Sequence, residues 1–182
     1  SAAAASDVYK RQMGSKESRI QSWTNHFILT IFFVLTTQYL ISSPVDDHQE
    51  RFEDVALKIW EYAELGYLEE KSSGLLQQEL KDSGFTIQSG IAGIPTAFIA
   101  EYNNGGPVLG ILGEFDALPG LSQQNVPFKT AEGLSSANGH ACGHHLFGAA
   151  SAWAVVAIKE WLEESGTPGT IRFYGTPAEE GG

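Results

Sequence analysis

The sequence predicts an α/β fold, in which helices pack against a sheet. A strand-like run at 108–114 is followed by an apolar helix at 146–158 and by a second strand at 170–174. Strand, buried helix and strand in this order are typical of a βαβ unit. The chain has 182 residues, of which 42% are hydrophobic and 11% aromatic, so one domain can form a proper core.

Two further helices are predicted ahead of these elements. Asp47 and Glu50 resemble a capping box, and the apolar face that follows consists of Phe52, Val55, Ile59 and Ala63. A second helix is expected to start at Ser72. It ends at Gly84, because glycine suits the left-handed position at a helix C-terminus.

Three strand-like runs follow these helices, at 85–88, 97–102 and 108–114. The segment Asn103 to Gly106 joins the last two and has strong turn chemistry, so we expect a β-hairpin there. The long apolar helix continues to Gly166. It is apolar almost all round, which predicts that it is buried.

Two N-terminal segments are expected to lie outside this fold. Residues 1–12 have no periodicity and resemble an adapter-derived, artefactual leader. Residues 13–43 have a basic start and an apolar run at 27–41, shorter than the ~20 residues that span a bilayer. This pattern predicts a cleaved signal peptide, or a signal anchor if it stays uncleaved, and a buried helix is the alternative. The protein is then secretory or extracellular, or cytoplasmic if the segment is artefactual.

Charge and cysteine content exclude two classes of protein. The formal net charge is −11, from 22 acidic and 11 basic residues, and no cluster of Lys and Arg offers a nucleic-acid surface. The chain has a single cysteine, so a disulfide framework is excluded. Stability must therefore come from packing or from a bound metal.

Two polar loops have the composition of a metal site. Cys142 and His144 stand between glycines at the start of the apolar helix, and Glu179 and Glu180 follow the last strand. A helix N-terminus lowers the pKa of a thiol and favours the thiolate. Sulfur, imidazole and carboxylate together suit zinc or a similar divalent ion. Asp116 follows another strand, and in open α/β sheets ligands bind at the carboxyl ends of strands, so the three polar loops are expected to gather at one edge of the sheet.

Three neighbouring residues are open to more than one interpretation. His140, His145 and Glu114 could each ligate a metal or orient a ligand from behind. The alternatives for the main candidates are an inert buried cysteine, a solvated pair of acids and a helix cap at Asp116.

Three motifs in this order resemble metallopeptidase family 20. They are Gly-Glu-Phe-Asp-Ala-Leu-Pro-Gly at 113–120, Gly-His-Ala-Cys-Gly-His-His at 139–145 and Thr-Pro-Ala-Glu-Glu-Gly-Gly at 176–182. The family includes aminoacylases, hippurate hydrolases and auxin-conjugate amidohydrolases. The chain looks most like the branch that holds one of the aminobenzoyl-glutamate hydrolase subunits, and the resemblance covers the domain at 44–182.

The resemblance implies a three-layer α/β/α, zinc-peptidase-like catalytic domain with two divalent ions, zinc or alternatively manganese or cobalt. Cys142, His144 and Glu180 would be ligands, with Cys142 near the position of a bridging carboxylate in other members. Glu179 would be the general base, and Asp116 would orient an imidazole. The substrate would be a small N-acyl amino acid, dipeptide or aminobenzoyl-glutamate-like amide.

The chain departs from the family pattern in two ways. His145 stands where relatives carry Asp or Asn, so it could itself coordinate. Family members are longer, and their remaining histidine ligands and an inserted lid or dimerisation domain follow the second Glu. The resemblance therefore implies an N-terminal, truncated part of a catalytic domain that is inactive alone. The whole protein would be a homo-oligomer, with membrane contact only through an uncleaved N-terminal segment.

Two other functions remain open. Cys142 with a nearby histidine could be the nucleophile of a cysteine hydrolase, although the Glu pair would then have no role. A non-catalytic or assembly-only homologue could keep the fold without the chemistry.

Overall fold

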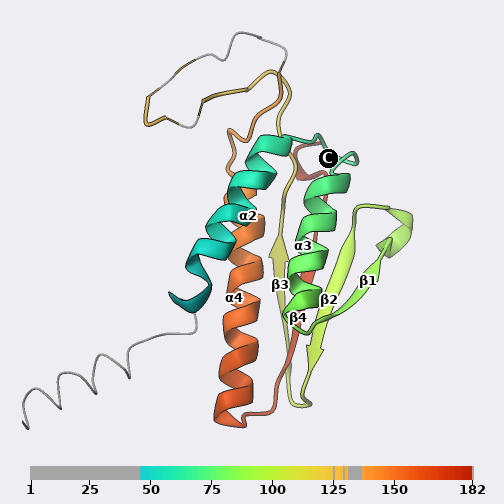
Figure 1. The fold of residues 1–182 in the computed structure, drawn as a ribbon. Coiled ribbons are helices and arrows are strands. Elements are labelled where there is room, and N and C mark those ends of the chain that lie inside the picture. The colour runs from blue at the N-terminus through green and yellow to red at the C-terminus, as the bar shows by residue number, and fades with distance from the viewer. Residues whose placement is uncertain (1–45, 125, 129, 131–136, 182) are drawn as a thin grey trace, which may run out of the picture. The chain divides into compact units, whose positions relative to one another are not determined.

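A computed structural model describes residues 46–124, 126–128, 130 and 137–181, which form a mixed α/β fold (Figure 1). The chain divides into two compact units, Ser1–Ser43 and Pro44–Gly182, and the described residues all belong to the second. Its elements are the 3-10 turns η1 (Asp46–His48), η2 (Ile91–Gly93) and η3 (Glu179–Gly181), the helices α2 (Gln49–Tyr62), α3 (Glu70–Asp82) and α4 (His144–Ser165), and the strands β1 (Thr86–Ser89), β2 (Phe98–Asn103), β3 (Val108–Gly113) and β4 (Thr170–Gly175).

The four strands form one sheet in the order β1-β2-β4-β3. β3 and β4 are parallel, with Val108 opposite Thr170 and Gly113 opposite Gly175. β2 runs antiparallel to both of its neighbours. The predicted βαβ unit is therefore confirmed, because α4 connects two adjacent parallel strands.

The predicted hairpin between β2 and β3 is wrong. Both strands pair with β4, which lies between them. The turn at Asn103 to Gly106 reverses the chain, and Gly105 and Gly106 take positive φ angles of 70° and 69°. The residues of a turn determine only that the chain reverses locally, whereas the position of β4 in the sheet is set by burial. Ile171 and Phe173 of β4 are fully covered, and a parallel crossover places β4 beside β3.

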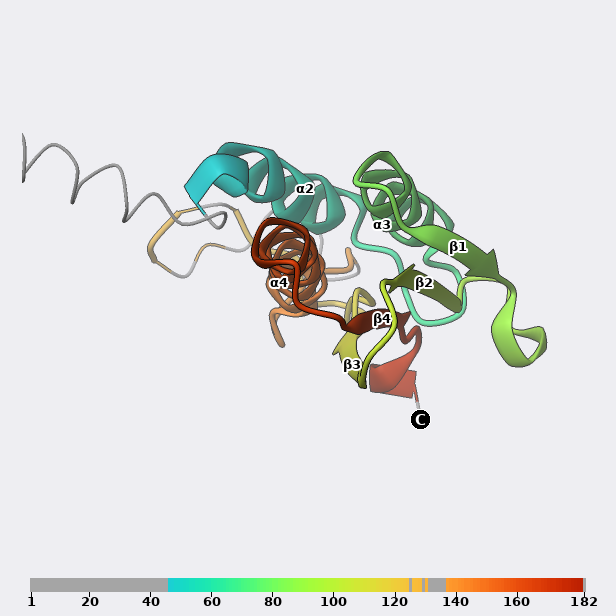
Figure 2. The ribbon, with the colours of Figure 1, turned by 90° about the horizontal axis from the view of Figure 1, so that it is seen from below.

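The three long helices lie on one face of the sheet (Figure 2). α4 packs on β3 and β4, α3 packs on β1 and β2, and α2 packs on α4 and α3. The core between these layers is built from apolar side chains, which include Phe52, Ile59, Leu76, Leu80, Phe98, Phe115, Val155 and Phe173. In the described residues the opposite face of the sheet has no helical layer, so the third layer of the expected α/β/α arrangement stays a prediction.

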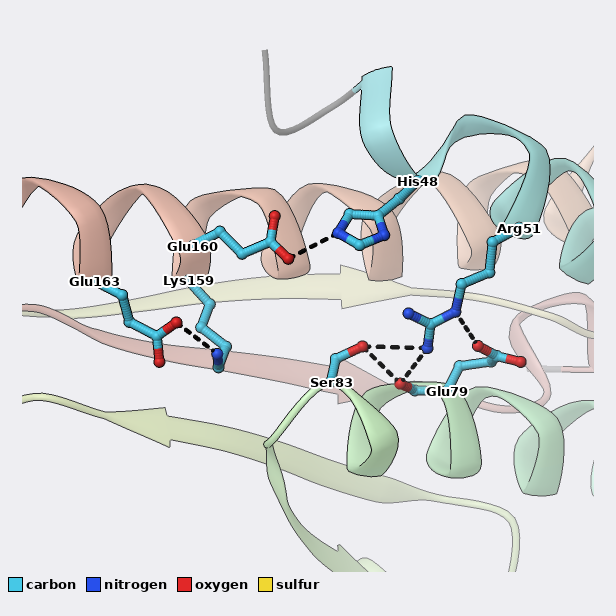
Figure 3. Close-up of polar contacts among 7 residues, drawn as sticks. All are labelled: His48, Arg51, Glu79, Ser83, Lys159, Glu160 and Glu163. Atoms are coloured by element: carbon cyan, nitrogen blue, oxygen red, sulfur yellow. Dashed lines mark hydrogen bonds and ion pairs between the residues drawn. The ribbon is translucent and has the colours of Figure 1, made fainter. Parts of the chain in front are cut away.

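Polar contacts tie α2 to both neighbouring helices (Figure 3). His48 Nε2 lies 2.7 Å from Glu160 Oε1 on α4. Arg51 donates to the side chain of Glu79 on α3, and its Nη2 donates to the Glu79 carbonyl at 2.8 Å and to Ser83 Oγ at 3.2 Å. These contacts fix the N-terminal part of α2 over the other two helices.

The predicted helix starts and ends hold only in part. The capping box at Asp47 and Glu50 is wrong, because His48 is the N-cap of α2 and its side chain makes no capping hydrogen bond. The chain begins α2 from the 3-10 turn η1 instead. α3 starts at Glu70 rather than Ser72, and Gly84 takes the expected left-handed conformation just past its end, with a φ of 89°.

The predicted leader at 1–12 and signal segment at 13–43 lie outside the described residues. Within the part of the chain that is described, no helix combines the length and apolar character that a membrane crossing requires.

Candidate metal centre

The polar loops meet at one edge of the sheet because β3 and β4 are parallel and end side by side. Glu114 and Asp116 follow β3, and η3 follows β4. α4 begins at His144 beside the same strand ends. The approach is close at Gly148, where a Cβ atom would lie 2.6 Å from the Glu114 carbonyl oxygen. The sequence prediction that three distant loops gather at this edge is therefore met by the structure.

His144 lies at the centre of this cluster and is buried. Its Nδ1 atom is 2.8 Å from Asp116 Oδ1. Its Nε2 atom faces three other carboxylates, Glu114 Oε2 at 3.0 Å, Glu180 Oε1 at 3.8 Å and Glu179 Oε2 at 3.9 Å. When Nδ1 carries the ring proton and donates a hydrogen bond to Asp116, the unprotonated Nε2 presents its lone pair toward these acids.

Asp116 holds two parts of the site at once. It is buried, and its second oxygen, Oδ2, accepts the backbone N–H of Glu180 at 2.9 Å. One carboxylate thus orients the imidazole at the start of α4 and the turn that carries the terminal acids. An orienting role for Asp116, which the family resemblance implies, requires contacts of this kind and stays a prediction.

The structure brings four of the five main candidates, together with Glu114, into two overlapping ligand sets, and Asp116 lies behind them on His144. One set contains Cys142, His144 and Glu180, and the other contains Glu114, His144 and Glu179, with the ligand atoms of each set within 4.8 Å of one another. Glu180 Oε1 is buried and has no hydrogen-bond partner among the residues that the structure describes. A divalent cation would satisfy this oxygen, and the mixture of sulfur, nitrogen and oxygen donors suits zinc, manganese or cobalt.

The expected effect of the helix N-terminus on Cys142 is wrong. The pKa of this thiol is raised, first by its interaction with the Glu180 carboxylate, then by burial and by the charges of Glu179 and Asp116. The acidic groups that raise it come from other loops of the site. In the protein without metal Cys142 is an exposed, protonated thiol rather than an activated thiolate.

Glu114 belongs to the second set, and its environment differs from that of an ordinary surface acid. Burial raises the pKa of its carboxyl, although the nearby His144 opposes this shift. The sequence alone is compatible with Glu114 as a metal ligand or as a residue that orients a ligand. Its contact with His144 Nε2 makes it a candidate ligand.

His140 and His145 lie behind the site and belong to neither ligand set. Their rings are 5.0 Å apart, and His140 Nε2 is 3.0 Å from the carbonyl oxygen of Ile59 on α2. Burial lowers the pKa of both, that of His145 to about 4. Both are neutral imidazoles near pH 7, and among the described residues the structure gives neither a place as a ligand.

Sequence reasoning missed two acidic residues between α2 and α3 whose carboxylates accept backbone N–H groups. Glu64 accepts from the backbone N–H groups of Lys71 and Ser72 at 3.0 and 2.8 Å, and so caps α3. Glu69 is completely buried, and its Oε1 accepts the backbone N–H of Ala178 at 2.8 Å. Glu64 stands shortly before a helix start, which is a weak capping signal. No local pattern marks Glu69, because its partner is 109 residues away.

Comparison with known proteins supports this interpretation of the motifs. Residues 110–182 match the model of peptidase family M20/M25/M40. A p-aminobenzoyl-glutamate hydrolase subunit of Escherichia coli (strain K12) is 43% identical over 142 residues, which are 78% of this chain and 30% of that protein. The human Xaa-Arg dipeptidase is 32% identical over 155 residues, 76% of this chain and 31% of the relative. The hippurate hydrolase of Campylobacter jejuni is 30% identical over 135 residues, 74% and 33% of the two chains.

Solved structures show the same arrangement of helices and strands. A Bacillus subtilis protein, described as a dinuclear metal binding peptidase from the M20 family, superposes with a TM-score of 0.62 at 27% identity, over 74% of this chain and 36% of its own. A structure from methicillin-resistant Staphylococcus aureus has a TM-score of 0.61 at 18% identity, which bears on the fold alone. The chain spans about a third of the length of the curated relatives.

Proposed function

The chain belongs to peptidase family M20/M25/M40, and on this premise we propose that it acts as a metal-dependent amidohydrolase. The reaction would cleave an amide bond of a small substrate with an activated water. The observation that carries the proposal is His144, which is held by Asp116 on one ring nitrogen and faces two sets of acidic and thiol groups with the other.

The ligand sets assign roles to the individual side chains. Cys142, His144 and Glu180 would hold one ion, and Glu114 would contribute to a second ion on the same Nε2 side of His144, while Glu179 is left for proton transfer. Two divalent ions bound there would polarise the scissile carbonyl and lower the pKa of a water molecule. We propose zinc, with manganese or cobalt as alternatives that the same donors accept.

Glu179 is the proposed general base. Its side chain is 55% exposed, in contrast to 17% for Glu180, so it can reach a substrate and solvent. It would accept the proton of the attacking water and return it to the leaving amine. Asp116 would keep the His144 ring and the Glu180 backbone fixed during both proton transfers.

The proposed substrate class rests on the names of the relatives. Their names include an aminobenzoyl-glutamate hydrolase, a dipeptidase and a hippurate hydrolase. All three names describe cleavage of an amide next to an amino acid. We therefore propose an N-acyl amino acid, a dipeptide or an aminobenzoyl-glutamate-like amide as substrate.

The test of the function is the substitution Glu179→Gln in the full-length protein, because this chain spans only about a third of the length of its curated relatives. We expect the variant to bind metal as the wild type does, measured as metal content by mass spectrometry, and to lose nearly all turnover of a panel of these three amides. Retained turnover would remove Glu179 from the mechanism. An absence of bound metal in the wild type would overturn the function itself.

A chelator separates the metal hydrolase from the two other functions. A hydrolase with Cys142 as nucleophile would keep its activity in EDTA, whereas the metal enzyme stops and recovers when zinc is added back. A non-catalytic homologue would bind metal without turning over any amide. The raised pKa of the Cys142 thiol does not favour the cysteine mechanism, which requires a thiolate.

Two properties of the whole protein are proposed with this function. We propose that the enzyme is a homo-oligomer, which mass photometry of the purified protein tests. We also propose that residues 13–43 direct it into the secretory pathway. N-terminal sequencing of the secreted protein would show a new terminus near Ser42 if the segment is cleaved, and cytoplasmic retention of the intact chain would contradict this.

A further inference from the structure

Glu69 is a buried acid that the proposed mechanism does not use. It is completely inaccessible to solvent, and it stands in the loop between α2 and α3. A buried carboxylate is costly unless donors surround it. Its Oε1 accepts the backbone N–H of Ala178 at 2.8 Å, and its Oε2 accepts the hydroxyl of Thr96 at 3.2 Å. Neither of these bonds goes to a candidate ligand, but Ala178 is the residue immediately before Glu179.

The turn at Ala178, which is hydrogen-bonded to Glu69, has an unfavourable backbone conformation. Ala178 has a φ of 61°, in the left-handed region that side chains other than glycine rarely adopt. A residue in this region persists when its surroundings hold it there. Within the turn, the Gly181 N–H donates to the Ala178 carbonyl at 3.3 Å. From outside the turn, Ala178 is held by the Glu69 bond and by close packing against Gly66, where a Cβ atom would lie 2.9 Å from the Ala178 Cβ.

The Glu69 carboxylate is itself held rigidly. Thr96 donates to it, and the carbonyl of Thr96 accepts the hydroxyl of Ser73 on α3 at 2.7 Å. Ser73 also donates its backbone N–H to the Glu69 carbonyl at 2.9 Å. The start of α3 and the segment before β2 thus form a fixed support on which the turn rests.

We propose that Glu69 is a positioning residue, which fixes the turn of Ala178 so that Glu180 and Glu179 face His144. This inference rests on the proposed function, because it concerns the ligands and the base of that site. Glu69 acts only through the backbone of the turn. Asp116 holds the next part of the same turn through the Glu180 N–H, so the two buried acids grip it at two neighbouring points.

The first experiment measures the contact without any metal. Amide hydrogen exchange of the 176–181 segment is compared between wild type and Glu69→Leu in EDTA. Leucine is similar in size to Glu but offers no acceptor, so we expect faster exchange of the Ala178 amide. Glu69→Gln keeps one carbonyl oxygen and should restore most of the protection. Unchanged exchange in Glu69→Leu would overturn the proposal.

The second experiment measures Zn²⁺ affinity by competition with a chromophoric chelator. We expect Glu69→Leu to weaken binding roughly 10- to 100-fold, as is typical when a group that orients a ligand is lost. Glu64→Leu is the matched control, because Glu64 belongs to the same loop and caps α3 without touching the turn. A loss of similar size in Glu64→Leu would mean that Glu69 acts only on general stability, and would overturn the proposal.

A double-mutant cycle tests the route of the effect. If Glu69 acts through Glu180, then Glu69→Leu should change affinity by less than about threefold in a Glu180→Gln background, because the coupling is lost. An equal loss in both backgrounds would refute this route. If Glu69→Leu does not fold, Thr96→Val provides a milder variant with the same expected direction, because it removes the hydroxyl that donates to Glu69, and unchanged affinity in Thr96→Val would then refute the proposal. A wild-type chain that binds no Zn²⁺ would overturn the proposed function, whereas unchanged affinity in Glu69→Leu would overturn only the role of Glu69.

Discussion

At the scale of single residues, Asp116 makes the two bonds on which the site geometry depends. Its two oxygens accept from His144 Nδ1 and from the backbone N–H of Glu180, and the side chain is buried. Each of the two carboxylate oxygens therefore accepts from a donor in a different element. An amide at this position can satisfy only one of the two donors, because its nitrogen is a donor.

We expect Asp116→Asn to lower Zn²⁺ affinity roughly 10- to 100-fold and to destabilise the fold by about 1–3 kcal/mol, since one buried N–H then faces an NH₂ group. Competition titration and urea unfolding measure the two effects. Asp54→Asn is the control, because Asp54 pairs with Lys58 on the exposed side of α2. Equal affinities for Asp116→Asn and the control would show that Asp116 orients no ligand.

The lowered pKa of His145 should make the stability of the metal-free protein depend on pH. Burial and the neighbouring His140 lower its pKa from 6.5 to about 4. Between these values the unfolded chain binds a proton that the folded chain does not, so stability falls as the pH falls from about 6.5 to about 4. After allowance for the partial exposure of the ring, the loss is roughly 1–3 kcal/mol.

The measurement is urea unfolding in EDTA across this pH range, for the wild type and for His145→Asn. Asparagine does not titrate, so the variant should lose less stability on acidification. His140 shifts in the same direction and remains in both proteins, so part of the slope will persist. Identical slopes for the two proteins would mean that His145 is not the buried neutral imidazole of the structure.

The residues of the site differ in how far the sequence predicts them. Cys142, His144 and Glu180 stand in short motifs whose donor types indicate a metal, and the structure brings them together. The shift of the thiol pKa could not be predicted, because it comes from Glu180, which is distant in the sequence. Glu69 was missed for the same reason. A buried acid is recognised by what surrounds it, and the partner of Glu69 comes from the far end of the domain.

At the scale of elements, α4 shows how close packing places the site. Gly148 on this helix lies against the carbonyl of Glu114, just past the end of β3. Because α4 comes so close to the Glu114 loop at Gly148, His144, one turn earlier on the helix, reaches the acids of that loop. The periodicity of the sequence predicts a buried helix here, but not which of its residues must be small.

Two glycines in helix interiors give a matched pair of substitutions. Alanine is better than glycine in a helix by about 1 kcal/mol, so Gly74→Ala on α3, with no atom near the new methyl group, should be stabilising by up to that amount. Gly148→Ala adds the same methyl group 2.6 Å from the Glu114 oxygen, and we expect a net destabilisation of about 1–3 kcal/mol. Urea unfolding of the two variants measures both. Stabilisation in both would contradict the close contact.

The pairing of β2 marks the limit of reasoning from local patterns. Asn103 to Gly106 has the composition of a hairpin turn, but β4 lies between the two strands that this turn connects. The order of strands is decided by which of them is most deeply buried and by the parallel crossover through α4. The strand runs and the crossover could be predicted from the sequence, whereas the position of β2 depends on long-range pairing.

At the scale of the whole domain, the candidate site joins segments that are far apart in the sequence. The Glu114–Asp116 loop, the Cys142–His144 turn and the Glu179–Glu180 turn come from the ends of β3, α4 and β4. On the other face of the sheet Val108 and Leu112 are about half exposed. The longer relatives have further chain that could cover such a face, which is why the third layer stays a prediction for the whole protein.

A metal that binds these three segments should act as a cross-link on the folded state. A ligand that binds only the folded chain stabilises it by RT ln(1 + [L]/Kd), about 2.7 kcal/mol at a free concentration of 100 times Kd. For a domain of this size that corresponds to a rise in Tm of roughly 5–15 °C. We therefore expect Zn²⁺ to raise the Tm of the 182-residue chain, and EDTA to reverse the rise.

The variant Cys142→Ser tests whether this stabilisation comes from the proposed site. Cys142 is exposed, so its replacement should change metal-free stability by less than about 0.5 kcal/mol, while it removes the sulfur ligand. Most of the rise in Tm with Zn²⁺ should then be lost. Glu50→Gln, an exposed acid on α2, controls for nonspecific binding of cations to an acidic protein and should keep the full rise. If Cys142→Ser kept the full rise as well, the cation would bind elsewhere on the surface, and the convergence of thiol, imidazole and carboxylates would have no role in holding it.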